Sequence, residues 1–109
     1  MAERPIGDHD VYILGYRWRV LAKDQAELQE EYEILWPGVA ANQSVSGLCI
    51  SYNHEIWYDE SLSVEMAVST ILHEVIHAID DHLGLNLTEQ QVQGLETGLF
   101  SLNRKREQY

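Results

Sequence analysis

The chain has 109 residues, 45% of them hydrophobic, and a formal net charge of −11 at neutral pH. This length predicts one domain, residues 1–109, with a single modest core. A surface this acidic repels phosphate groups, which argues against a protein that binds nucleic acid or an anionic membrane surface.

The first ten residues, MAERPIGDHD, contain no apolar stretch of the kind that forms a signal peptide. No apolar run elsewhere approaches the roughly 20 residues that span a bilayer. Cys49 is the only cysteine, so an intrachain disulfide is excluded. We therefore expect a cytoplasmic protein without membrane contact.

Two regular elements are expected in the first third of the chain. The segment 11–22, VYILGYRWRVLA, is rich in β-branched and aromatic residues and predicts one strand. Asp24 can cap a helix over residues 25–36, where apolar residues recur at roughly helical spacing. Pro37 and Gly38 are expected to end this helix.

A β-hairpin is expected next. The runs GLCISY (47–52) and EIWYD (55–59) flank Asn53 and His54, which are suited to a tight connection. We expect His54 to be a turn residue. Cys49 lies among apolar neighbours and is expected to be an inert core residue.

The hydrophobic period changes to 3.6 residues after the hairpin, which predicts a helix from Val64 to about Gly84. Ser61 or Ser63 can cap its start, and Gly84 can end it. The apolar positions are Val64, Ala67, Val68, Ile71, Leu72, Val75, Ile76 and Ile79.

A last helix is expected to begin after Thr88, its N-cap, with Glu89 in the first turn. Its predicted buried stripe is Val92, Leu95, Leu99 and Leu102. The order strand, helix, hairpin, helix, helix predicts a small α+β domain.

The motif HEVIH, residues 73–77, lies in the middle of the first of these two helices. Residues four apart share one helix face, so the imidazoles of His73 and His77 can converge on one metal ion. Neutral imidazole is a good ligand of Zn²⁺. Glu74 lies about 100° round the helix, where it can act as a general base. The competing interpretation is an amphipathic helix with two surface histidines.

A catalytic zinc site needs a third protein ligand, and the last helix offers two glutamates. Glu96 follows His77 by nineteen residues, and in a tight antiparallel helix pair it would lie level with the motif. Glu89 follows His77 by twelve residues and would lie nearer His82 in the same register. Spacing alone favours Glu96.

Beyond these patterns, the chain resembles small phage-encoded proteins related to the ImmA/IrrE zinc metallopeptidases. The resemblance rests on ILHEVIHAID (71–80) and LTEQQVQGLETGL (87–99). In that family a glutamate followed at +3 and +6 by apolar residues supplies the third ligand. Glu89, with Val92 and Leu95, matches this pattern, so the resemblance favours Glu89 over Glu96.

The resemblance implies a minimal zincin-like domain, a small and mostly antiparallel sheet packed on the HExxH helix and a following helix. It further implies a gluzincin-type peptidase in which His73, His77 and Glu89 bind Zn²⁺ and Glu74 is the general base. The substrate would be a protein or peptide in the host cytoplasm. The alternative is a non-catalytic phage protein, with structural zinc or a cleft that binds a host or phage protein. The sequence does not predict the oligomeric state.

Other residues are weaker candidates. In zincin-type peptidases an edge strand pairs with extended substrate, which suggests Trp57 and Tyr58 as substrate-binding residues; half-buried strand aromatics are the competing interpretation. Asp80 or Asp81 could accept a hydrogen bond from a ligand imidazole, although a solvated helix end also explains Asp81. His82 fits the helix C-terminus better than a metal site.

Overall fold

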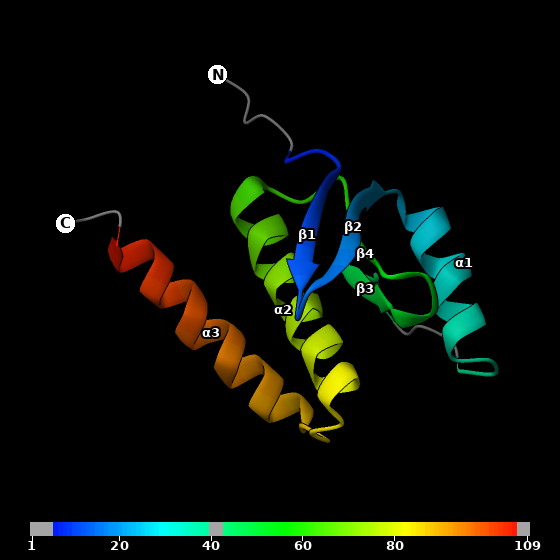
Figure 1. The fold of residues 1–109 in the computed structure, drawn as a ribbon. Helices are drawn as coiled ribbons and strands as arrows, with labels where there is room; N and C mark the ends of the chain where they lie inside the picture. The colour runs from blue at the N-terminus through cyan, green and yellow to red at the C-terminus, as the bar shows by residue number, and fades with distance from the viewer. Residues whose placement is uncertain (1–5, 40–42, 107–109) are drawn as a thin grey trace.

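The longest helix, α2 (Val64–Leu83), packs across one face of a four-stranded sheet (Figure 1). Ser63 begins α2 by accepting a hydrogen bond from the backbone N–H of Met66. Gly84, in the left-handed conformation, ends it. The predicted helix is therefore confirmed, with Ser63 as its cap, whereas Ser61 hydrogen-bonds to Asp59.

This computed structural model describes residues 6–39 and 43–106, with side chains up to residue 102. The sheet has the strand order β1-β2-β4-β3. Its strands are β1 (His9–Ile13), β2 (Tyr16–Lys23), β3 (Gly47–Ile50) and β4 (Glu55–Asp59). The outer pairs β1–β2 and β3–β4 are antiparallel, and the central pair β2–β4 is parallel. The α+β class and the mostly antiparallel sheet are confirmed.

The prediction of one strand over residues 11–22 is wrong. A turn at Leu14 and Gly15 divides the segment into β1 and β2. Both residues have positive φ, 51° and 85°, as in the two-residue turns that join antiparallel strands. Leucine is an unusual residue for this conformation, so the apolar pattern hid the turn. The second hairpin is confirmed, with His54 in the left-handed conformation at its turn.

Helix α1 (Gln25–Leu35) covers the opposite face of the sheet, over β3 and β4 (Figure 1). Asp24 caps it in a reciprocal capping box with Glu27, which confirms the predicted start. Two buried clusters result, one under each helix. The α2 side holds Ile13, Trp18, Val20, Ile56, Tyr58, Ala67 and Ala78, and the α1 side holds Leu28, Val45, Leu48 and Ile50.

Helix α3 (Glu89–Arg106) packs on α2 and begins after Thr88, whose hydroxyl accepts from the backbone N–H of Gln91. The predicted buried stripe is wrong except at Val92, because Leu95, Leu99 and Leu102 are 47%, 47% and 66% exposed. Among the described elements α3 packs mainly on α2 and so buries only a narrow face, which includes the Glu96 carboxylate. None of the described helices has the length and apolar character to cross a lipid bilayer.

Candidate metal centre

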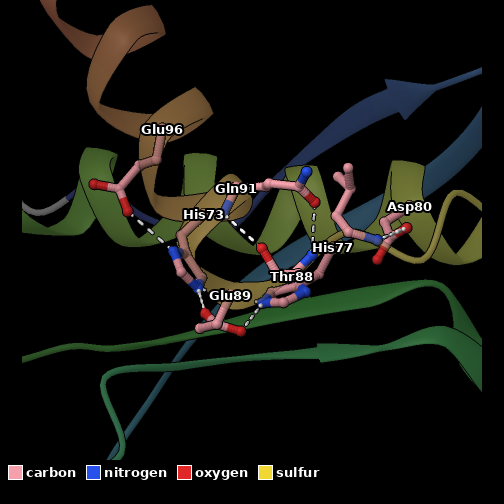
Figure 2. A network of polar contacts seen from close by, with 8 residues as sticks. His73, His77, Asp80, Thr88, Glu89, Gln91 and Glu96 are labelled. Atoms are coloured by element: carbon pink, nitrogen blue, oxygen red, sulfur yellow. Dashed lines mark hydrogen bonds and ion pairs between the residues drawn. The ribbon is translucent and has the colours of Figure 1, made fainter.

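Three side chains from two helices converge beside the middle of α2. His73 and His77, one turn apart on α2, have their Nε2 atoms 3.2 Å from each other. Glu89, in the first turn of α3, places Oε1 2.8 Å from Nε2 of His73 and Oε2 3.5 Å from Nε2 of His77. Figure 2 shows the Glu89 carboxylate between the two imidazoles.

Two of these separations, 3.2 and 3.5 Å, are close to those of a tetrahedral metal site, and the 2.8 Å contact between Glu89 and His73 would lengthen on metal binding. Zinc–nitrogen and zinc–oxygen bonds are about 2.0–2.2 Å, so neighbouring ligand atoms of a tetrahedral site lie about 3.3–3.5 Å apart. One ligand atom from each of His73, His77 and Glu89 can be chosen so that all three lie within 4.8 Å of one another. The Glu89 side chain is 65% exposed, which leaves the solvent side of the group open. Two imidazoles and one carboxylate therefore form a donor set that fits zinc with one open position.

Glu96 contacts the same group from the other side of His73. Its Oε1 lies 3.0 Å from Nδ1 of His73, and its Oε2 accepts a hydrogen bond of 2.6 Å from the hydroxyl of Ser69. With a metal ion bound between Nε2 and Glu89, the Glu96 carboxylate would accept a hydrogen bond from Nδ1–H of His73 and so direct the Nε2 lone pair toward the ion. The structure thus groups Glu89 with the two histidines and makes Glu96 an orienting partner of His73.

The connection between α2 and α3 sets this register. The Asp80 side chain accepts a hydrogen bond of 3.1 Å from the backbone N–H of Leu87 (Figure 2). The Asp81 carboxylate instead accepts from the hydroxyl of Ser51, which follows β3. No contact of either aspartate with a histidine is seen among the described side chains, so the expectation that one of them orients a ligand imidazole is wrong.

The side chain of Glu74, on α2, lies against the edge strand β3. A Cβ atom added at Gly47 would be 3.3 Å from Cγ of Glu74, so the two elements are in close approach there. Burial raises the pKa of Glu74 from 4.5 to about 7. The imidazole of His73 opposes this rise, whereas the carboxylates of Glu89 and Glu96 add to it. A carboxyl group with this pKa can exchange a proton near neutral pH.

His73, His77 and Glu89 together could hold a metal ion, and we call them the metal group. This group opens into a cleft of about 970 Å³ that runs along β3. Residues 43–49 form one side of the cleft, and α2 and α3 contribute His73, Glu74, His77, Glu89 and Glu96 to it. Because β3 is the last strand of the sheet, its outer edge has no partner strand within the described residues.

The suggested substrate contacts of Trp57 and Tyr58 are not supported by their positions. Strand β4 is paired on both sides, with β2 and β3, and has no free edge. Trp57 packs with the α1-side cluster under the Lys23 ammonium group, and Tyr58 is buried on the α2 side. Neither residue lines the cleft. The competing interpretation, buried or half-buried strand aromatics, fits them better.

The remaining residues named from the sequence lie outside the metal group. His54 stacks on Trp18, with ring centroids 4.7 Å apart. His82, in the last turn of α2, contacts the ring of Tyr16. Cys49 is half-buried against the α2-side core, and burial raises the pKa of its thiol to about 12. A thiol with this pKa is a poor nucleophile, which fits an inert residue.

Sequence reasoning missed three features of the site: the orienting role of Glu96, the hydroxyl of Ser69, and the free edge of β3. Glu96 was considered only as a ligand, although its position seven residues after Glu89 puts both on one face of a helix. No local pattern marks Ser69 or the edge strand, because both depend on tertiary neighbours.

The sequence matches no protein-family model, and neither a curated protein nor a solved structure is significantly similar to it.

Proposed function

We propose that this protein is a zinc-dependent peptidase. The observation that carries the proposal is the convergence of His73, His77 and Glu89 beside the half-buried Glu74, in a cleft that borders a strand edge with no partner strand among the described residues. The resemblance to the ImmA/IrrE metallopeptidases points to the same chemistry and, with it, to a phage protein that acts in the host cytoplasm.

The donor atoms of His73, His77 and Glu89 would hold the zinc ion, which supplies Lewis-acid polarisation of a carbonyl group and lowers the pKa of a water molecule. Glu74 accepts the proton of the attacking water and then donates it to the leaving amine. Glu96 keeps the Nδ1 proton of His73 in place, so that Nε2 remains a lone-pair donor.

The outer edge of β3 is the proposed place for the substrate backbone, instead of residues 55–59. The backbone N–H and C=O groups on this edge, which have no partner strand among the described residues, can bind an extended peptide as an added strand. Such a peptide would pass the metal group, because Gly47 and Cys49 line the same cleft as His73 and Glu74.

Metal content and cleavage test the proposal together. We expect about one zinc per chain in protein purified without chelator, and loss of zinc on His77→Ala. Glu74→Gln should keep zinc and fold but cleave no peptide, because an amide cannot accept the proton. A wild type without stoichiometric metal, or a Glu74→Gln variant that cleaves a peptide library at the wild-type rate, would refute the mechanism. Zinc without cleavage by either form would favour the non-catalytic binding protein.

A further inference from the structure

One part of the cleft wall is apolar. Tyr32 and Trp36, at the end of α1, line it. Trp36 is 47% exposed, although it lies in a concave surface. The rings of Tyr32 and Trp36 contact each other, with centroids 5.0 Å apart. Exposed apolar side chains gathered in a cleft are typical of a binding site for an apolar group.

The edge strand β3 divides this wall from the metal group. Gly47 faces α2, since an added Cβ would meet Thr70 and Glu74, and Leu48 packs in the α1-side cluster. Both Gly47 and Leu48 nevertheless line the same cleft. The cleft therefore passes round the free edge of β3, with the metal group on the α2 side and the aromatic wall on the α1 side.

A peptide strand added to this edge would meet both sides alternately. Successive side chains of an extended chain point to opposite faces of a sheet. When one residue faces α2 and the metal group, its neighbour faces α1 and the wall of Tyr32 and Trp36.

The charge of the cleft restricts the peptide further. Four carboxyl groups line the α2 and α3 side, from Glu74, Asp81, Glu89 and Glu96. A bound Zn²⁺ would offset two of these four charges and two would remain, so an acidic peptide side chain away from the metal position would still be repelled, whereas neutral or basic side chains would not.

We infer that the cleft selects an extended, non-acidic peptide with a large apolar side chain, which packs on Tyr32 and Trp36 next to the residue at the metal group. This inference rests on the proposed function in taking the metal group as the place where the peptide is held. The apolar contact itself does not depend on cleavage.

Binding of short peptides tests the inference. The probes are acetylated, amidated hexapeptides of Ala, Gly and Ser with one Phe, Ala or Asp placed at each position in turn. They are titrated into zinc-loaded Glu74→Gln protein, which should bind without cleaving, and into metal-free wild type. We expect the best Phe peptide to bind at least tenfold more tightly than its Ala counterpart in both proteins, and the Asp peptide to bind more weakly than both in the metal-free wild type, where no cation can hold its carboxylate.

Variants locate the contact. Trp36→Ala should reduce the affinity of the Phe peptide to that of the Ala peptide, and Tyr32→Ala should reduce it in part. Ile34→Ala is the matched control, because Ile34 is an exposed α1 residue outside the cleft. Circular dichroism establishes that each variant is folded.

Equal affinity for Phe and Ala peptides overturns the inference, as do folded Trp36→Ala and Tyr32→Ala variants that bind like the parent. Absence of binding by any peptide also overturns it. These outcomes are distinct from failure of the peptidase proposal: a Phe preference that persists without zinc supports the apolar wall even if the wild type cleaves nothing.

Discussion

Replacing Glu74 with glutamine should change how the stability of the metal-free protein depends on pH. In the folded chain, burial raises the pKa of this carboxyl group to about 7 from an ordinary value of 4.5. The folded state therefore binds a proton more tightly than the unfolded state. Stability from this group is present below pH 4.5 and is lost as the pH rises through 7, where the buried group must ionise.

The size of the effect follows from the shift. Each pKa unit corresponds to about 1.4 kcal/mol, so a rise of about 2.5 units amounts to about 3 kcal/mol in total, of which about 2.5 kcal/mol is lost between pH 5 and pH 8. Glu74→Gln removes the titrating group and keeps its shape. The free energy of unfolding of the wild type, relative to this variant, should fall by that amount over the same range.

Urea unfolding in the presence of a chelator, followed by circular dichroism at pH 5, 6, 7 and 8, measures both proteins. Glu30→Gln is a suitable control, because it removes one charge from an exposed position on α1. Parallel pH curves for wild type and Glu74→Gln would refute the burial argument. Added zinc should restore stability to the wild type at pH 8, because a nearby cation favours the ionised carboxyl group.

Two further comparisons test the register and the close approach at the site. Glu89→Ala should lower zinc affinity by several orders of magnitude and Glu96→Ala by about 10–100-fold, because only the first variant removes a ligand. Zinc titration against a competing chelator measures both, and the reverse order of affinities would make Glu96 the ligand. Gly47→Ala should lower the free energy of unfolding by about 1–3 kcal/mol, because the new Cβ would lie 2.5 Å from Cγ2 of Thr70. Gly94→Ala, in open space on α3, should instead raise the free energy of unfolding by about 0.5–1 kcal/mol. Equal changes in this free energy for the two variants, measured by thermal or urea unfolding, would contradict the predicted clash at Gly47.

Local patterns were sufficient where the neighbours that matter lie within one element. The start of α1 at Asp24 and the end of α2 at Gly84 depend on backbone groups a few residues away. The same patterns failed at Leu14, where an apolar residue occupies a turn, and at Leu95, which stays 47% exposed although it belongs to the predicted buried stripe.

The sequence by itself determined that His73 and His77 share a face of one helix, because a spacing of four residues has that consequence in any α-helix. It did not determine which glutamate joins them. That choice depends on the turn between α2 and α3, where the hydrogen bond from Leu87 to Asp80 and the burial of Val92 set the position of one helix along the other. Only this tertiary register places Glu89 between the imidazoles and Glu96 behind His73, because contacts between elements are decided by packing and not by spacing along the chain.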